Sequence, residues 1–363
     1  MPALETMVTQ HLAERHAAHL LRAIQPDAQT GLVSFATNDY LGLSQEPTVV
    51  AAGEQALAQW GAGAGASRLV QELSPGYTKL EAALAAAKGT EAALVFGSGY
   101  LAMLGVIPAL VGKGDLVMAD RLIHASMLDA VKLSGARLLR FSHNDLSILN
   151  NKLEINRNKF NNCLILTESV FSMDGDVSPL EAMRALADQH DAWLLSDDAH
   201  GFGVVETPRV AHLQMGTLSK AVGGYGGYVC CKAPVREYLV NHARTLIYST
   251  ALPPGVVASA EAGVRWIMQQ QGISLPLQRA RKFTHGLGLP EAESAIVPVV
   301  IGTAEDALKA SEALKNKGFY VPVMRPPTVP KGTARLRFSF SRLHTEVQVE
   351  ALIRAVRECG CVA

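Results

Sequence analysis

Residues 193–201 read WLLSDDAHG, and residues 213–220 read LQMGTLSK. In the first stretch an apolar run leads directly to the acid pair Asp197 and Asp198 and then to His200. In the second stretch a similar run leads to Lys220. Short apolar runs of this kind predict buried strands, and ligands of open α/β sheets gather beyond the carboxyl ends of the strands. We therefore expect the acid pair, the histidine and the lysine to meet at one edge of a sheet.

An acid, a histidine and a lysine are the groups that a pyridoxal phosphate (PLP) site requires. Lys220 would form the Schiff base with the cofactor, and Asp197 would keep the pyridine nitrogen protonated so that the ring can accept electrons. His200 would reach the ring oxygen. The charged ring would also explain why a buried strand ends in two carboxylates.

The composition limits the kinds of partner that the protein can have. The chain has 363 residues, 48% of them apolar and 18% charged, which is enough for a large core and too long for one simple domain. Its formal net charge is zero, so we expect neither nucleic acid nor a membrane as a partner. The N-terminus lacks a signal-peptide pattern, and no apolar stretch is long enough to span a bilayer. The five cysteines form no CxxC pair, which predicts a reducing, cytoplasmic compartment without disulfides or a metal site.

Short apolar runs alternate with helical stretches up to about residue 240. This alternation predicts an α/β fold whose large domain contains a mostly parallel, seven-stranded sheet covered on both faces. The expected strands are residues 93–96, 116–119, 137–141, 163–167, 193–197, 213–217 and 228–231. Helices are expected between them at residues 80–87, 101–111 and 180–190.

The pattern changes after residue 253, where a small α+β domain is expected to begin. Its expected elements are helices at 256–270, 305–317 and 345–357 and strands at 295–301, 320–323 and 335–340. An amphipathic helix over about residues 4–24, with Leu12, Leu20 and Leu21 on one side, is expected at the other end of the chain. We therefore predict an N-terminal helix and arm (1–45), a large cofactor-binding domain (46–253) and a small C-terminal domain (254–363).

Ser98, Gly99 and Tyr100 follow an expected strand and open an expected helix. Small residues at such a point let backbone N–H groups approach an anion, and the helix dipole favours negative charge, which suits the cofactor phosphate. A strand-to-helix turn often requires glycine in any case, so this motif indicates a phosphate site only in combination with Lys220. The glycine-rich stretch 61–68 lacks the ending of a phosphate loop, and we expect it to border the site.

Other candidate residues have both a functional and a structural interpretation. His124 could stack on the flat face of the pyridine ring, although a lone histidine is usually a satisfied surface or core residue. Glu168 and Ser172 follow another expected strand and could contact the ring, although the Asp-Gly pair at 174–175 also favours a simple turn. Arg335 and Arg337 share an expected strand, and one of them could clamp a substrate carboxylate, although the sequence alone favours a surface salt bridge.

Five motifs together resemble a known family, the PLP-dependent α-oxoamine synthases. They are NDYLGL (38–43), HAS (124–126), SMDGD (172–176), DDAHG (197–201) and TLSK (217–220). Two further stretches, IYST (247–250) and RPPTVPKGTARLR (325–337), resemble the branch of this family that acts in biotin biosynthesis. The resemblance covers nearly the whole chain, although the segments near 27–32, 204–212 and 274–289 are shorter than the family pattern.

The resemblance implies the fold-type I architecture of PLP-dependent transferases and a homodimer with active sites at the subunit interface. It implies catalytic roles for Lys220, Asp197, His200 and His124. The further cofactor contacts that it implies are Ser98, Gly99, Tyr100, Ser172 and Thr217, with Ser249 and Thr250 reaching the cofactor of the partner subunit. The substrate contacts that it implies are Arg22, Asn38, His124, Thr328 and Arg337, with Arg337 on the amino-acid carboxylate.

The implied activity is an acyl transfer with loss of carbon dioxide. L-alanine would condense with a pimeloyl thioester of coenzyme A or acyl carrier protein, and the free thiol would leave. One alternative is a member of the same family that uses glycine and a short acyl-CoA. An aminotransferase on the same fold and a non-catalytic partner subunit are further alternatives, and the presence of Lys220 argues against the last of them.

Overall fold

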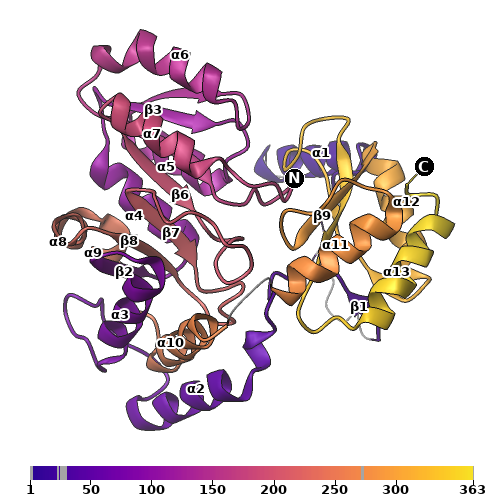
Figure 1. Cartoon of the computed structure of the whole chain (residues 1–363), viewed down its shortest axis with the longest axis horizontal. Helices are drawn as coiled ribbons and strands as arrows, with labels where there is room; N and C mark the ends of the chain where they lie inside the picture. The colour runs from indigo at the N-terminus through magenta and orange to yellow at the C-terminus, as the bar shows by residue number, and fades with distance from the viewer. Residues whose placement is uncertain (1–2, 23, 25–30, 271–273, 363) are drawn as a thin grey trace. The chain divides into compact units, whose positions relative to one another are not determined.

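A seven-stranded sheet forms the centre of the larger part of the chain (Figure 1). The structure, a computed structural model, describes residues 3–22, 24, 31–270 and 274–362. Within the sheet β8 is antiparallel to both of its neighbours, and every other neighbouring pair is parallel. The strand order is β2-β8-β7-β6-β5-β3-β4, with β2 (Ala92–Phe96), β3 (Leu116–Asp120), β4 (Arg137–Phe141), β5 (Cys163–Glu168), β6 (Trp193–Asp197), β7 (Leu213–Thr217) and β8 (Gly227–Cys231). The predicted α/β class and the mostly parallel, seven-stranded sheet are confirmed.

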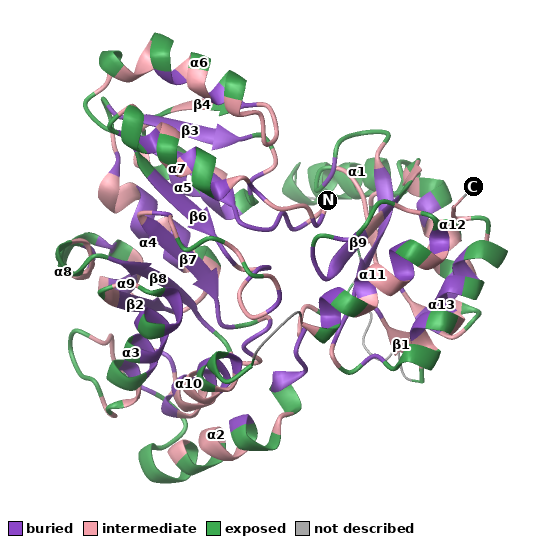
Figure 2. Ribbon diagram, viewed as in Figure 1, coloured by how far each residue is buried: buried purple, intermediate pink, exposed green. Residues whose placement is uncertain are grey.

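Helices cover both faces of this sheet because its strands are apolar on both sides. Leu164 and Leu166 of β5 pack into one cluster of buried residues, whereas Cys163 and Ile165 of the same strand pack into another. The sheet is accordingly the most continuously buried part of this unit (Figure 2). The helices are α2 (Pro47–Trp60), α3 (Gly76–Lys88), α4 (Gly99–Leu110), α5 (Ala125–Ser134), α6 (Leu146–Asn156), α7 (Leu180–Gln189), α8 (Ala233–His242), α9 (Arg244–Ile247) and α10 (Pro254–Met268), with short 3-10 turns at Leu43–Gln45 and Arg157–Lys159.

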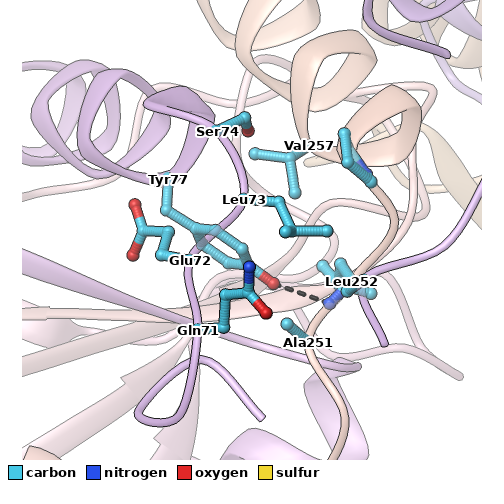
Figure 3. Close-up of a pocket in the computed structure, with 10 residues that line it drawn as sticks. Gln71, Glu72, Leu73, Ser74, Tyr77, Ala251, Leu252 and Val257 are labelled. Carbon is cyan, nitrogen blue, oxygen red and sulfur yellow. Dashed lines mark hydrogen bonds between the residues drawn. The ribbon is translucent and has the colours of Figure 1, made fainter. Parts of the chain in front are cut away.

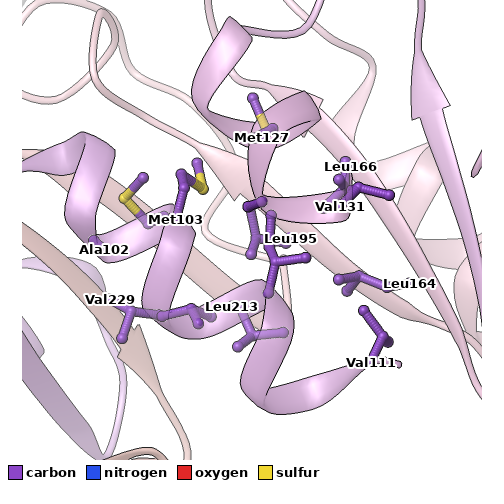
Figure 4. Packing of buried hydrophobic residues seen from close by; sticks show 14 of the residues in the cluster. Ala102, Met103, Val111, Met127, Val131, Leu164, Leu166, Leu195, Leu213 and Val229 are labelled. Atoms are coloured by element: carbon purple, nitrogen blue, oxygen red, sulfur yellow. The ribbon is translucent and has the colours of Figure 1, made fainter. Parts of the chain in front are cut away.

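The two faces are covered by different helices. Met103 of α4 and Met127 of α5 pack against Leu195 and Leu213 in the cluster on one face (Figure 4). Helices α6 and α7 supply Leu149, Leu153, Met183 and Ala187 to the cluster on the other face. Burial of apolar surface on both faces fixes the strands in place, so that their carboxyl ends form a rigid edge.

The rest of the chain forms a second unit, made of Met1–Thr37, Met173–Gly175 and Leu275–Ala363; the first unit comprises Asn38–Ser172 and Asp176–Ser274. In the second unit, β11 (Val323–Met324), β12 (Ala334–Ser339) and β9 (Ile296–Gly302) form an antiparallel sheet in that order, and β1 (Val33–Ser34) pairs in parallel with β10 (Phe319–Tyr320). Its helices are α1 (Ala3–Ala17), α11 (Leu275–Leu287), α12 (Ala304–Lys315) and α13 (Glu346–Glu358). The predicted domain boundaries after residues 45 and 253 stay a prediction.

Two expected elements of the second unit differ from the structure. The strand expected at 320–323 is two short strands, β10 and β11, because Pro322 lies between them and a proline has no N–H to donate to a ladder. The N-terminal helix ends at Ala17 instead of about residue 24, and His19 follows in a left-handed conformation with φ 56°. None of its residues is buried, so the expected apolar side covers no core within the described chain.

Among the described residues, no helix has both the length and the apolar character needed to cross a membrane. The cytoplasmic compartment expected from the cysteines stays a prediction.

Candidate active site

The carboxyl ends of β6 and β7 bring Lys220 and His200 together. The two strands are parallel neighbours, with Asp197 opposite Met215. Lys220 follows β7 by three residues, and its Nζ lies 2.8 Å from Nε2 of His200. The predicted meeting of the histidine and the lysine at one edge of the sheet is therefore present.

A buried tyrosine extends this pair on the far side of the imidazole ring. The hydroxyl of Tyr40 lies 2.6 Å from Nδ1 of His200 and donates to Oδ1 of Asn38 at 3.1 Å. A hydroxyl has one hydrogen, so donation to Asn38 leaves its oxygen to accept from Nδ1–H of His200. This tautomer directs the Nε2 lone pair of His200 at Lys220. Asn38, Tyr40, His200 and Lys220 thus form one hydrogen-bonded chain.

Two carboxyl groups stand side by side at the same edge. Glu168 at the end of β5 is opposite Asp197 at the end of β6, and both are buried. Burial raises the pKa of Glu168 to about 8, and the charge of Asp197 acts in the same direction. Burial also raises the pKa of Asp197, although the charges of Lys220 and His124 oppose this shift. A cation bound beside Asp197 would offset the cost of its charge.

Only one carboxylate oxygen of Glu168 has a hydrogen-bond partner among the described residues. Its Oε2 accepts from the backbone N–H of Ser172 at 3.1 Å, whereas its Oε1 is buried and has no hydrogen-bond partner among the described residues. A buried polar atom without a partner is costly, and in native structures it usually marks a place for a ligand, an ion or a water. Glu168 and Ser172 are therefore brought together as predicted, with an oxygen left over for a further group.

His124 caps the N-terminus of α5 with its side chain. Its Nδ1 lies 2.8 Å from Oγ of Ser126 and accepts from the Ser126 backbone N–H at 3.2 Å. Desolvation lowers its pKa below the ordinary value; the charge of Asp197 opposes this shift and the charge of Lys220 adds to it. His124 therefore has hydrogen-bond partners within the fold, as its structural interpretation predicts. Its stacking on the cofactor ring stays a prediction.

The predicted phosphate residues meet at the start of α4. Ser98 caps this helix by accepting from the backbone N–H of Leu101 at 3.1 Å. Gly99 packs against the side chain of Thr217 at the end of β7. Thr217 in turn donates to the carbonyl of Gly226 at 2.9 Å. The first N–H groups of a helix have no partner within it, so this turn offers donors to an anion. Tyr100, also in this turn, is tied to Asp129 through its hydroxyl.

Asp198 faces away from this arrangement and has its own partner. It forms a buried ion pair with Lys88 at the end of α3. The interpretation that a charged cofactor explains both carboxylates of the acid pair is therefore wrong for Asp198, because the ammonium group of Lys88 already neutralises it.

The remaining predicted substrate residues lie in the second unit. Arg22 donates to Oγ1 of Thr328 at 2.9 Å. Arg337 is buried in β12 and donates to Oγ of Ser339 at 2.8 Å. Arg335 is also buried, and it pairs with Asp174 at 2.5 Å. The sequence favours a surface salt bridge for these arginines. The predicted surface location is wrong, because both arginine side chains are buried.

Ser249 and Thr250 lie beside the glycine-rich stretch. Ser67 and Thr250 form an antiparallel bridge, and Ala251 donates to the carbonyl of Ala66 at 3.0 Å. A small pocket opens next to this bridge, and there the hydroxyl of Tyr77 accepts from the backbone N–H of Leu252 at 2.7 Å (Figure 3). The residues that line it include none of the predicted site residues.

Sequence reasoning missed two residues that the structure joins to the site. Tyr40 carried a signal, because a buried tyrosine hydroxyl needs a partner and Tyr40 lies within the NDYLGL motif. Lys88 carried none, because a lysine in the last turn of a helix is ordinarily an exposed partner of the helix dipole.

These residues fit pyridoxal phosphate. A lysine amine, a buried acid next to it, an unpartnered carboxyl oxygen and a helix N-terminus meet at one sheet edge. This fold and this set of groups define a PLP-dependent enzyme of the α/β class.

Comparison with known proteins specifies the family. The family model for aminotransferase class I and II matches residues 30–356. An 8-amino-7-oxononanoate synthase of Methylobacterium sp. (strain 4-46) is 52% identical, with 99% of this chain and 98% of that protein covered. The chain therefore belongs to the class I and II aminotransferase family and, within it, to the family of the 8-amino-7-oxononanoate synthases.

Solved structures agree with this assignment. A structure of SPT with a PLP internal aldimine has a TM-score of 0.88 at 29% identity, with 100% of both chains covered. A structure of 8-amino-7-oxononanoate synthase from Francisella tularensis has a TM-score of 0.75 at 27% identity and covers 91% of this chain and 98% of that one. The predicted fold-type I architecture and the predicted cofactor are confirmed: the cofactor of this enzyme is pyridoxal 5'-phosphate.

Proposed function

We propose that this protein condenses L-alanine with a pimeloyl thioester to give 8-amino-7-oxononanoate, carbon dioxide and the free thiol. The observation that carries this proposal is the 52% identity to an 8-amino-7-oxononanoate synthase over 99% of the chain. The presence of Lys220 in hydrogen-bond contact with His200 supports a catalytic chain over a non-catalytic partner subunit.

Lys220 and His200 handle the proton in the proposed reaction. The cofactor, when bound, supplies an electron sink for the charge that develops on the α-carbon of the amino acid. Lys220 would hold the cofactor through Nζ, and the same amine would accept the α-proton of the substrate. His200 holds Nζ in place through the 2.8 Å contact, and Tyr40 and Asn38 hold the tautomer of His200.

The neighbouring residues hold the cofactor. Asp197 would hold the pyridine nitrogen in its protonated form, and His124 would lie against the ring. Glu168 and Ser172 contact ring substituents, a role that the unpartnered Oε1 of Glu168 supports. Ser98, Gly99, Tyr100 and Thr217 bind the phosphate, in keeping with their position at the start of α4.

Charged and polar residues are the proposed substrate contacts. Arg337 binds the carboxylate of L-alanine, because a guanidinium fork matches a carboxylate bidentately. Arg22, Asn38 and Thr328 contact the substrates as well, and the 2.9 Å bond between Arg22 and Thr328 supports a joint role for these two.

The proposed enzyme is a homodimer in which Ser249 and Thr250 reach the cofactor phosphate of the partner subunit. Exposed apolar side chains next to the Ser67–Thr250 bridge support this: Val70 is 78% exposed and Tyr248 72% exposed. Large apolar side chains exposed together mark interaction surfaces. Val70→Glu should therefore shift the protein from dimer to monomer in analytical ultracentrifugation. Val347→Glu, at a similarly exposed valine of α13, is the control, and equal dimer content in both variants would contradict the proposed interface.

The reaction itself is tested by product mass. The protein is mixed with PLP, L-alanine labelled with ¹³C at the carboxyl carbon, and pimeloyl thioesters of coenzyme A and of acyl carrier protein. We expect unlabelled 8-amino-7-oxononanoate and labelled carbon dioxide from at least one carrier. Parallel reactions with glycine and a short acyl-CoA test the alternative family activity. Labelled pyruvate without loss of carbon dioxide would indicate an aminotransferase, and product only from glycine would refute the proposed substrates.

A further inference from the structure

A buried ion pair between Lys88 and Asp198 lies next to Asp197, the carboxylate proposed to hold the cofactor nitrogen. Lys88 and Asp198 are 4% and 3% exposed and are 110 residues apart in the chain. Asp198 follows Asp197 immediately, so the ion pair and the cofactor-facing acid are joined by one peptide bond. Two adjacent buried carboxylates repel each other unless a cation compensates one of them.

Asp198 also organises the turn that carries His200. Its backbone N–H donates to Met215 of β7 at 2.7 Å, and its carbonyl accepts from Gly201 and Phe202 at 3.2 and 3.1 Å. Its Oδ1 accepts from Oγ of Ser169 at 2.5 Å. A Cβ on Gly201 would collide with this carboxylate, so the turn closes tightly around it. The geometry of His200 therefore depends on a carboxylate that is held in place on both oxygens.

Aromatic rings lie beside the buried ion pair. The ammonium group of Lys88 lies 5.4 Å from the centre of the Phe202 ring. Phe202 in turn packs edge-on against Tyr228, with ring centres 6.1 Å apart. At such a buried site, removal of one charge leaves the other without its counter-ion, and this is far more costly than removal of both.

We propose that Lys88 is a positioning residue of the active site. Its ammonium group cancels the charge of Asp198, so that Asp197 alone presents negative charge to the cofactor and the turn bearing His200 keeps its shape. This inference rests on the proposed roles of Asp197 and Lys220 in cofactor binding.

The charges around Asp197 predict how loss of Lys88 would change the protonation of the lysine–cofactor linkage. Lys220 faces Asp197 with positive charge, and the backbone N–H of Ala199 donates to Asp197 at 3.0 Å. Burial lowers the pKa of His124 and raises the pKa of Glu168 to about 8, so both neighbours are largely uncharged at neutral pH and Asp198 is the next negative charge. Without Lys88, the charge of Asp198 would add to this set uncompensated. More negative charge near Lys220 would favour the protonated form of the lysine–cofactor linkage.

The test compares Lys88→Met, Asp198→Asn and the double variant, with Lys79→Met as the control on the exposed side of the same helix. Each protein is stripped of cofactor and titrated with PLP, and the visible absorbance band of the bound cofactor is then followed against pH. We expect Lys88→Met to bind PLP about tenfold more weakly or worse and to shift the midpoint of the absorbance change about one pH unit upward. The double variant should recover both values to within about threefold and about 0.3 pH unit of wild type, because it contains no unpaired charge. A purely structural lysine would alter melting temperature but not this midpoint.

Two results would overturn the inference. One is a folded Lys88→Met protein with the PLP affinity and midpoint of Lys79→Met. The other is a folded double variant that binds PLP as poorly as Lys88→Met. If Lys88→Met does not fold, recovery of PLP binding in the double variant supports the inference and its failure refutes it. Because the readout is cofactor binding, wild-type protein that binds PLP but makes no 8-amino-7-oxononanoate would refute the proposed substrates and leave this inference standing.

Discussion

The substitution Tyr40→Phe removes one oxygen atom from the chain that ends at Lys220. The ring of Tyr40 is fully buried, so phenylalanine keeps its packing. The lost hydroxyl is the group that lies 2.6 Å from His200 Nδ1 and donates to Asn38. His200 then loses the partner that selects its tautomer, so its Nε2 lone pair is no longer fixed toward Lys220.

The size of the effect follows from the burial of His200, which is 6% exposed. Removing one partner of a buried polar group costs about 1–3 kcal/mol. We expect the cofactor-free protein to lose about that much unfolding free energy, because one buried and one part-buried hydrogen bond disappear without a compensating contact. If the same loss is felt in the proton-transfer step, kcat/KM falls about 5- to 150-fold.

Urea denaturation and steady-state kinetics measure the two effects separately. Tyr238→Phe is the matched control, because Tyr238 is 45% exposed and its ring stacks on His242 at 3.9 Å. That variant should match wild type in both measurements. A Tyr40→Phe protein with wild-type stability and with kcat/KM within twofold of wild type would refute the reasoning, since the hydroxyl would then neither fix the tautomer nor satisfy a buried group.

Three further predictions concern titratable groups. Lys220→Ala should fold with little change in melting temperature but lose the visible band of bound cofactor and all product; a retained band would refute the covalent role of Lys220. Burial opposes a charge on His143, but hydrogen bonds to Asp120 and Asp176 outweigh it and raise the pKa of His143 from 6.5 to about 10. The protonated imidazole therefore contributes its full stabilisation below about pH 6.5, and this contribution is lost as pH rises toward 10. The difference in unfolding free energy between wild type and His143→Asn should therefore shrink between about pH 7 and 10, and a constant difference would contradict this. Burial, followed by the charge of Asp197, raises the pKa of Glu168 from 4.5 to about 8. This group therefore lowers the stability of the fold progressively as pH rises from about 4.5 to 8, and the loss is complete above about pH 8. Cofactor-free Glu168→Gln should exceed wild type in stability at about pH 9, and the reverse order would show that Glu168 ionises in the fold without cost.

The strands and the reactive residues that follow them could be predicted from the sequence. Runs such as residues 163–166 are apolar on both faces, and a short run of this kind, bounded by polar residues, favours a buried strand. Asp197, His200 and Lys220 come directly after such runs, and side chains at strand ends are brought together whenever the strands share a parallel sheet. Local sequence therefore determined which residues could meet.

The order of the strands and the long-range pairings depended on tertiary structure. An apolar run has the same pattern whichever strand lies beside it, so the antiparallel position of β8 between β2 and β7 is not visible in the chain. Tyr40 reaches His200 across 160 residues, and Lys88 reaches Asp198 across 110. In each case the partner is chosen by how a helix or an arm packs on the sheet. Packing maximises apolar burial over the whole unit at once, and the polar pairs that it encloses follow from that packing and not from sequence spacing.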